Sequence, residues 1–222
     1  MFQPCLEILP RAQRVLWDEL RHTPEHFTLY GGTALALRLG HRESVDFDFF
    51  SPEPFEADRI IKEIHYLDGA EQRAVAKNTL TCVVDRGGGP VKMQFFGGLT
   101  LGIVEPRQQP EGAGFWVASL IDVAACKLRV LPERAEAKDY LDVDALLRHG
   151  LGLPAMLAAA QVVYGRGFNP LLPLKALSYF DDVKRIPDDT KKRLSTAAAA
   201  VDIHNLPTIN PGEPRPSSGI KP

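Results

Sequence analysis

Residues 28–51, TLYGGTALALRLGHRESVDFDFFS, combine a Gly-Gly turn, a short helical pattern and a five-residue strand pattern. Side chains of a strand alternate between its two faces. Asp46 and Asp48 are therefore predicted to share one face, whereas Phe47 and Phe49 share the other and can enter a core. Two carboxylates this close repel each other, and a cation between them relieves the repulsion. Their oxygen atoms suit Mg²⁺, which binds one or two carboxylates and otherwise keeps water or phosphate oxygens.

The Gly-Gly turn indicates a second half of the same site. Gly31 and Gly32 follow an apolar run, residues 27–30, that predicts a strand, and they precede residues 33–39, which predict a helix. Glycine lets the backbone turn sharply and approach a ligand closely. The free N–H groups at the start of a helix favour an anion such as phosphate. A glycine turn, a helix and an Asp-x-Asp strand are together typical of a metal-dependent phosphoryl or nucleotidyl transferase.

The run from Gly31 to Phe50 resembles the signature of nucleotidyltransferases related to the AbiEii/AbiGii abortive-infection toxins. The pattern His-Arg-x-Ser-x-Asp-x-Asp-Phe-Phe of that family is intact here, beginning at His41. The resemblance implies a polymerase-β-like nucleotidyltransferase fold. We expect His41 itself to be structural, because it lies at a helix end that needs a polar hydrogen-bonding group.

The same resemblance implies roles for individual residues. Asp46 and Asp48 would hold Mg²⁺ or Mn²⁺ and act in catalysis. The phosphates of an NTP would be cradled by Gly31, Gly32 and Thr33, and Arg42 would neutralise their charge.

A second signature of the resembled family begins at Ser119. Its Asp-x-x-x-x-Lys helix, its arginine and its Lys-Asp-hydrophobic-x-Asp run match Asp122, Lys127, Arg134 and residues 138–142. The resemblance implies that Lys127 is catalytic and contacts the nucleotide phosphates, and that Asp139 is catalytic as well. A lysine on a helix of Ala, Val and Leu is costly to bury without an anionic partner.

That partner would be a triphosphate or, in the empty protein, Asp46 or Asp48. The alternative for Lys127 is a lysine at the edge of the core that extends its amine to water. Asp139 and Asp142 are three residues apart near a predicted helix N-terminus, where the helix dipole favours acids. The dipole by itself could explain both.

The position of a third carboxylate departs from the superfamily pattern. Such enzymes place this residue on a neighbouring strand, and in the predicted strand 91–96 the matching residue is Gln94. Glutamine is neutral and cannot serve as a general base. Lys92 shares the face of Gln94 and could reach a phosphate, although a solvated lysine explains it equally well.

The predicted fold is α+β: a mixed twisted sheet with flanking helices, followed by a C-terminal helical lobe. Residues 1–118 would form the nucleotidyltransferase core, residues 119–204 the helical lobe and residues 205–222 a flexible proline-rich tail.

Several elements are predicted within this organisation. Strands are expected at 72–77, 79–85, 91–96 and 101–104, with an extended piece at 115–118. Helices are expected at 55–66, 120–131, 138–149, 154–164, 171–179 and 188–203. The first helix is expected over residues 5–22 or, because Pro10 interrupts its pattern, only from Pro10 onward.

Composition bounds the class of protein. The chain has 222 residues, 45% of them hydrophobic, and a formal net charge of −2. With this net charge no overall basic field attracts nucleic acid, so RNA would need a local patch of positive charge. The three cysteines have no metal-ligand spacing, which indicates a reduced cytoplasmic protein. We expect no signal peptide and no membrane partner.

The leading functional prediction is transfer of an NMP from an NTP to an acceptor hydroxyl of RNA, such as the tRNA acceptor end. The context would be a toxin–antitoxin or phage-defence pair, with a cognate antitoxin as partner. Two alternatives stay open. One is a nucleotide-binding relative whose catalysis is impaired at Gln94, and the other is a transferase that acts on a small molecule.

Overall fold

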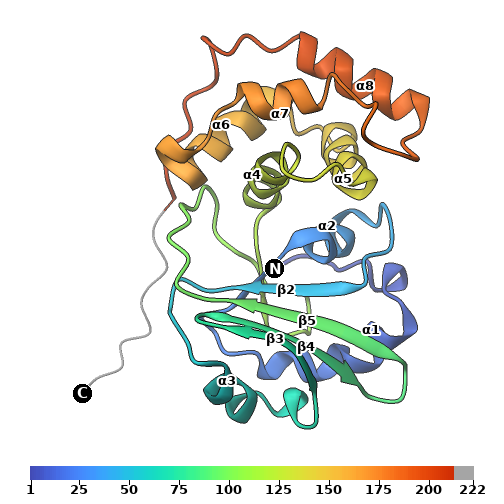
Figure 1. The fold of residues 1–222 in the computed structure, drawn as a ribbon, viewed down its shortest axis with the longest axis vertical. Helices are drawn as coiled ribbons and strands as arrows, with labels where there is room; N and C mark the ends of the chain where they lie inside the picture. The colour runs from blue at the N-terminus through green and yellow to red at the C-terminus, as the bar shows by residue number, and fades with distance from the viewer. Residues whose placement is uncertain (213–222) are drawn as a thin grey trace. The chain divides into compact units, whose positions relative to one another are not determined.

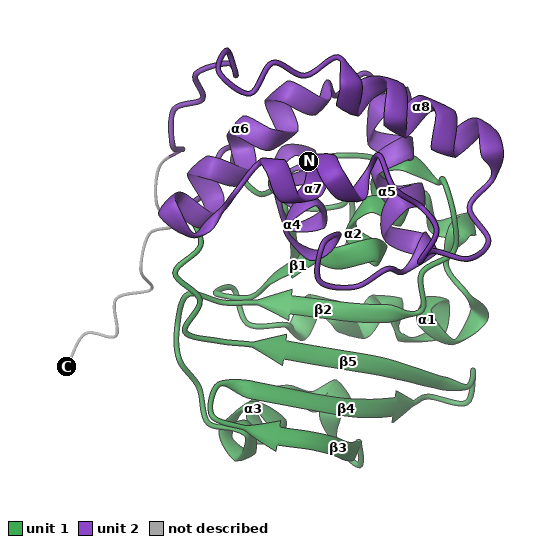
Figure 2. Cartoon of the chain, turned by 45° about the horizontal axis from the view of Figure 1, so that its top comes forward, with its two compact units in different colours: residues 1–101, 107–118, 215–222 green, residues 102–106, 119–214 purple. Residues whose placement is uncertain are grey.

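The computed structural model describes residues 1–212, which fall into two compact units (Figures 1 and 2). Unit 1 contains residues 1–101 and 107–118, and unit 2 contains residues 102–106 and 119–212. Part of the predicted flexible tail, residues 213–222, lies outside the described residues.

Unit 1 is built on a mixed six-stranded sheet with the order β3-β4-β5-β2-β1-β6. The strand β2 lies inside the sheet, parallel to β5 and antiparallel to β1. The strands are β1 (Thr28–Tyr30), β2 (Asp46–Phe50), β3 (Glu71–Ala76), β4 (Thr79–Asp85), β5 (Pro90–Phe96) and β6 (Trp116–Val117). The predicted mixed sheet is therefore confirmed.

One aromatic cluster fixes which face of β2 is buried. Phe47 and Phe49 are fully buried, and the ring of Phe49 stacks on that of Phe95 with centroids 5.4 Å apart. Burying one such side chain contributes about 1.5–3 kcal/mol. A one-residue slip of β2 would move both rings into solvent and both acids into the core. The cluster thus holds Asp46 and Asp48 on the opposite face.

The helices of unit 1 are short. They are η1 (Leu6–Ile8), α1 (Arg11–Leu16), η2 (Trp17–His22), α2 (Gly31–Leu39), α3 (Ala57–Glu63) and η3 (His65–Leu67). The helix predicted over all of residues 5–22 is wrong, because residues 6–8 form a separate 3₁₀ turn, whereas the alternative start at Pro10 agrees with α1, which begins at Arg11. Pro10 has an extended ψ of 153° and begins α1, and the backbone tightens into a 3₁₀ helix after Leu16.

Unit 2 is helical. Its helices are α4 (Leu120–Val130), α5 (Ala137–Arg148), α6 (Leu153–Tyr164), η4 (Gly165–Gly167), α7 (Leu171–Ala176) and α8 (Asp188–Ala199). Ser119 caps α4, since its hydroxyl accepts a hydrogen bond from the N–H of Asp122. The predicted helix over residues 188–203 ends earlier, at Ala199.

The predicted strand at 101–104 is wrong. The N–H of Gly102 donates to the carbonyl of Val163 at 2.9 Å, and the N–H of Val104 donates to Oδ1 of Asp122 at 2.8 Å. These groups bind α6 and α4 instead of a neighbouring strand. The described end of the chain also contacts this segment, because the N–H of Gly212 donates to the carbonyl of Ile103 at 2.7 Å.

A helix must be long and apolar to cross a bilayer. In residues 1–212 no single helix is both long and apolar enough to cross a membrane. The pair formed by α5 and residues 153–167 meets the length and composition criteria only when taken together, and it is bent by 117°.

Candidate active site

The two acids of β2 lie as the strand pattern predicted. Asp46 and Asp48 are half-buried on one face of the strand, and Phe47 and Phe49 are buried on the other. On the neighbouring strand β5, Lys92 is paired in register with Asp46, and its Nζ lies 3.7 Å from Oδ2 of that residue. The side chain of Lys92 is 44% exposed, as expected for a solvated strand lysine, and it also forms an ion pair at the site; its contact with a phosphate stays a prediction.

The side chains around the site explain why residues 31 and 32 are glycines. Gly31 has a φ of +73°, a left-handed conformation that other residues rarely adopt, and a Cβ there would overlap Oδ2 of Asp48. A Cβ on Gly32 would lie 2.7 Å from Nη2 of Arg42 and 2.8 Å from Oγ of Ser44. The two glycines thus let the first turn of α2 approach the acid and the guanidinium closely.

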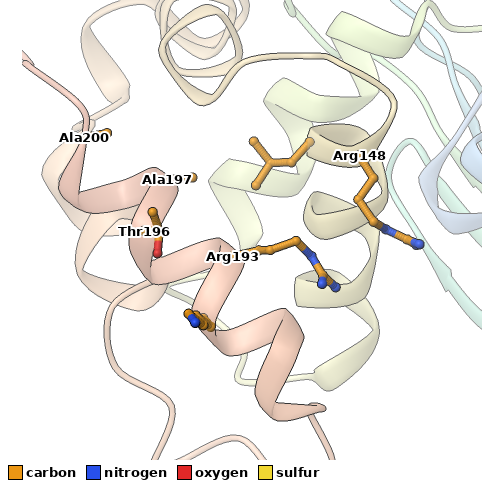
Figure 3. Close-up of a pocket in the computed structure, with 7 residues that line it drawn as sticks. Arg148, Arg193, Thr196, Ala197 and Ala200 are labelled. Atoms are coloured by element: carbon orange, nitrogen blue, oxygen red, sulfur yellow. The ribbon is translucent and has the colours of Figure 1, made fainter.

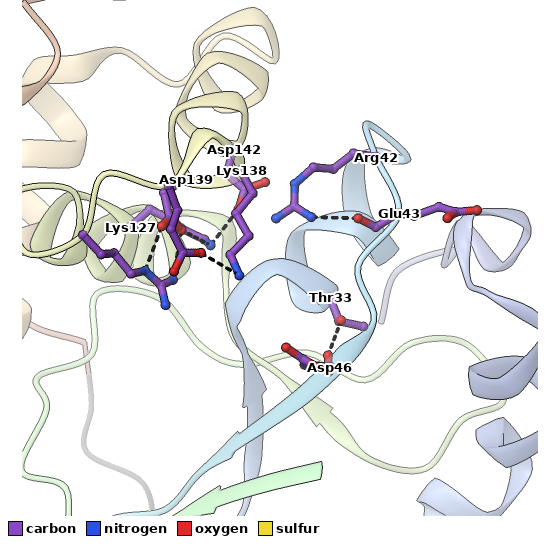
Figure 4. Close-up of polar contacts among 10 residues, drawn as sticks. Thr33, Arg42, Glu43, Asp46, Lys127, Lys138, Asp139 and Asp142 are labelled. Carbon is purple, nitrogen blue, oxygen red and sulfur yellow. Dashed lines mark hydrogen bonds and ion pairs between the residues drawn. The ribbon is translucent and has the colours of Figure 1, made fainter. Parts of the chain in front are cut away.

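Thr33 and Arg42 stabilise the backbone around this turn (Figure 4). The hydroxyl of Thr33, which is fully buried, donates to the carbonyl of Asp46, so it ties α2 to β2. Arg42 donates from Nη1 to the carbonyl of Glu43 at 2.7 Å. The binding of phosphate by either residue stays a prediction.

Gln94 stands where the superfamily pattern expects the third acid. On β5 it is the residue paired in register with Asp48. Within residues 1–212 no group of three or more His, Cys, Asp or Glu is arranged to hold a metal ion. The site therefore offers the two carboxylates of β2 and the neutral amide of Gln94.

This donor set fits Mg²⁺ or Mn²⁺. One or two carboxylates are the usual protein contribution to a Mg²⁺ site, in which water and phosphate oxygens provide the remaining ligands. The carboxylate of Asp48 occupies the space that a Cβ at residue 31 would take, so it is held against the glycine turn. A metal ion on Asp48 would accordingly lie beside backbone that can approach a phosphate closely.

Unit 2 contains a separate buried cluster of charges (Figure 4). The side chain of Lys127, on α4, is 6% exposed, and its Nζ lies 2.9 Å from Asp139 and 2.6 Å from Asp142, both on α5 and 0% exposed. The expectation that Asp46 or Asp48 pairs with this lysine in the empty protein is wrong. The acids that neutralise it come from the next helix.

Arg134 completes this cluster from the turn between the two helices. Its Nε and Nη2 donate to the two carboxylate oxygens of Asp139 at 2.8 and 3.1 Å. A bidentate pair of this kind fixes the carboxylate in one orientation. Burial, with smaller effects of the nearby Asp139 and Asp182, raises the pKa of Tyr140, so this phenol stays neutral beside the cluster.

Sequence reasoning undervalued Arg134 and Asp142. The sequence showed the arginine only as part of the second signature, and the helix dipole explained the acid equally well. The available signal was the spacing, because residues 139 and 142 lie on one side of α5. Only the packing of α4 against α5 shows that this side faces Lys127.

Comparison with known proteins identifies a family and relatives that this chain resembles. The family model described as "Nucleotidyl transferase AbiEii toxin, Type IV TA system" matches residues 14–207. An uncharacterised protein of Aquifex aeolicus (strain VF5) is 33% identical over 161 residues, which are 71% of this chain and 75% of that protein.

Two solved structures share the fold. MenT4, a nucleotidyltransferase toxin from Mycobacterium tuberculosis, is 18% identical with a TM-score of 0.59, over 87% of this chain and 83% of its own. A candidate nucleotidyltransferase from H. pylori is 17% identical with a TM-score of 0.54, over 85% of this chain and 90% of its own. The family match extends over both signatures, the Asp-x-Asp strand and the Lys127 helix, and the chain belongs to the AbiEii nucleotidyltransferase toxin family.

Proposed function

We propose that this protein transfers an NMP from an NTP to an acceptor hydroxyl of RNA, with Mg²⁺ or Mn²⁺ bound at Asp46 and Asp48. The observation that carries the proposal is the pair of acids on one face of β2, next to a glycine turn at the start of α2. Within the type IV toxin–antitoxin family to which the chain belongs, tRNA is the acceptor that we propose, and a cognate antitoxin is the proposed protein partner.

The proposed reaction is a substitution at phosphorus. The acceptor oxygen bonds to the α-phosphorus, the bond between that phosphorus and the oxygen bridging to the β-phosphate breaks, and pyrophosphate leaves. The proton of the acceptor hydroxyl passes to water, because Gln94 is neutral and cannot accept it. When bound, the metal ion supplies charge stabilisation for the phosphate oxygens.

The residues of the chain contribute binding and positioning. Asp46 and Asp48 hold the metal ion, and the first-turn N–H groups of Gly32 and Thr33 are suited to the phosphates because they lie at the positive end of α2. Arg42 adds a positive charge beside this turn, because its guanidinium lies close to Gly32, in space that a Cβ on that residue would need.

The cluster of unit 2 contributes a buried cation. We propose that Lys127 contacts the NTP phosphates and that Asp139 orients its amine, because the two groups lie 2.9 Å apart with almost no exposure to solvent. A preformed geometry costs no reorganisation when negative charge develops. Residues 1–118 and 119–204 are the proposed catalytic core and helical lobe.

Label transfer tests the proposal. Wild-type protein is incubated with each labelled NTP in turn, Mg²⁺ and a tRNA pool, beside the variants Asp46→Asn and Asp48→Asn. Asp58→Asn, on the exposed start of α3, is the matched control. Label on the RNA with wild type and the control, and none with the two β2 variants, is the expected result.

Three other outcomes would change the conclusion. Label on a small-molecule acceptor and none on RNA would replace the proposed substrate. NTP binding in calorimetry that requires Mg²⁺, without turnover on any acceptor, would indicate a binding protein, and Gln94→Asp would then be expected to raise the activity. A complete lack of Mg²⁺-dependent NTP binding would refute the proposed site.

A further inference from the structure

A groove between α5 and α8 lies within unit 2 and takes no part in the Lys127 cluster. It has a volume of about 470 Å³ and is lined by Leu147, Arg148, Lys192, Arg193, Thr196, Ala197 and Ala200. The acid beneath it is Asp144, which is two residues from Asp142 on α5. Helix residues two apart point in different directions, so the groove and the lysine cluster use different sides of α5.

The arginines of the groove are held in place by this buried acid. Asp144 has a side chain that is 3% exposed, and it accepts hydrogen bonds from Nε and Nη2 of Arg193 at 2.7 and 2.9 Å. Nε of Arg148 lies 3.3 Å from the same carboxylate. The two arginine side chains are still about half exposed, so each can present donors to a ligand, and the bidentate pair with Asp144 fixes the orientation of Arg193 (Figure 3).

The groove carries a net positive charge. Arg148, Lys192 and Arg193 provide three positive charges against the negative charges of Asp144 and of Asp189, which also acts on Arg193. The neighbouring Lys191 is different, because its Nζ lies 3.2 Å from Asp188 and it does not line the groove. The chain as a whole has a net charge of −2, so this is a local positive surface on a protein that is slightly negative.

The basic side chains of the groove suit a phosphodiester, because arginine forks match phosphate oxygens in a bidentate manner. The remaining lining is mostly apolar and includes the short side chains of Thr196 and Ala197 on α8 and of Ala200 just after it, which leave room for a sugar-phosphate backbone (Figure 3). The hydroxyl of Thr196 adds a donor of the kind that contacts phosphates in nucleic-acid complexes.

We propose that the α5–α8 groove binds the phosphate backbone of the RNA acceptor. This inference rests on the proposed function for the identity of the ligand. It explains where RNA would bind a protein whose negative net charge does not attract it. Neutralising phosphates releases condensed counterions, so affinity at this surface depends steeply on salt.

The test measures RNA affinity without requiring turnover. Fluorescence anisotropy of a labelled tRNA pool is recorded between about 50 and 200 mM KCl, a range in which phosphate contacts dominate the salt dependence. The test variant is Arg148→Gln/Lys192→Gln, which leaves the bidentate pair of Arg193 with Asp144 intact. Lys191→Gln, on the adjacent residue of α8, is the matched control, and thermal unfolding checks that every variant is folded.

The expected result is a difference in both affinity and salt slope. Each lost phosphate contact lowers the slope of log K against log salt by about 1, so the double variant should lose about 2 and bind about tenfold or more weakly. The control should bind as wild type does. Equal binding by wild type and the double variant would overturn the proposal, as would a complete lack of RNA binding.

Competition identifies the ligand. Inorganic phosphate that displaces the RNA at the same molar concentration of phosphate groups would indicate a site for free phosphate. Polyglutamate that displaces it equally well would indicate a protein partner with an acidic segment. Either result overturns the RNA assignment.

Activity separates this proposal from the proposed function. If NMP is transferred to RNA, the double variant should show a raised KM for RNA and an unchanged kcat. Transfer with an unchanged KM would refute the groove alone, whereas groove-dependent RNA binding without transfer to RNA would refute the proposed reaction alone.

Discussion

Replacing Lys127 by methionine removes the only charge of that side chain and keeps its length. In the wild-type structure the amine is 2.9 Å from Asp139 and 2.6 Å from Asp142, and all three side chains are at most 6% exposed. Removing one partner of a buried ion pair costs about 3–5 kcal/mol, because it leaves an uncompensated charge without water. Arg134 still neutralises Asp139 through two hydrogen bonds, so we expect the lower half of this range.

Urea unfolding followed by far-UV circular dichroism measures the effect, because unit 2 is helical. With a slope of about 2–3 kcal/mol per M, a loss of 3–4 kcal/mol lowers the urea midpoint by about 1–2 M. The matched control is Lys138→Met. Its amine lies 2.8 Å from Glu136, but the two side chains are 48% and 46% exposed, and an exposed pair of this kind contributes about 1 kcal/mol or less.

A double-mutant cycle isolates the contact. The loss in Lys127→Met/Asp142→Asn should be smaller than the sum of the two single losses by about 0.5–3 kcal/mol, the usual coupling of residues in contact. Additive losses, or a loss in Lys127→Met no larger than in Lys138→Met, would show that the amine is not held between these acids.

Two further predictions follow from the backbone and the thiols. Gly31→Ala should lower the free energy of unfolding by about 1–2 kcal/mol because of its left-handed conformation, and by more because of the overlap with Asp48, and transfer activity should fall as well. The control is Gly69→Ala, since Gly69 has the same φ of +73° but open space around it. Equal losses of stability in the two variants would refute the overlap. Burial raises the pKa of Cys82 and of Cys126 from 9.0 to about 11. Their reaction with Ellman's reagent near pH 8 should therefore be about 100-fold slower in the folded protein than in urea, and equal rates would show that these thiols are not buried.

Local patterns in the sequence predicted the central strand well. The alternation of acids and phenylalanines over residues 46–49 was enough to place the carboxylates on one face, because strand geometry leaves no other arrangement. The glycines at 31 and 32 predicted a turn with close contacts, and their neighbours in the fold are the site residues Asp48, Arg42 and Ser44.

Two predicted elements depended on contacts and backbone changes that local sequence patterns do not report. The segment 101–104 has the composition of a strand, but its N–H groups bind Asp122 and the carbonyl of Val163, which are distant in the sequence. The first helix was predicted as one element because its apolar spacing continues past Pro10. Periodicity does not report that the backbone changes to a 3₁₀ helix after Leu16.

The sequence by itself determined the acid face of β2, the glycine turn and the membership of a nucleotidyltransferase family, since each depends on neighbouring residues in one short run. Only the tertiary structure decided which charges meet. Lys127 is paired with Asp139 and Asp142, and Lys92 with Asp46, because helix packing and strand register bring together side chains that their spacing in the chain does not relate. A buried charge must find its opposite within a few ångströms, and the fold selects the partner.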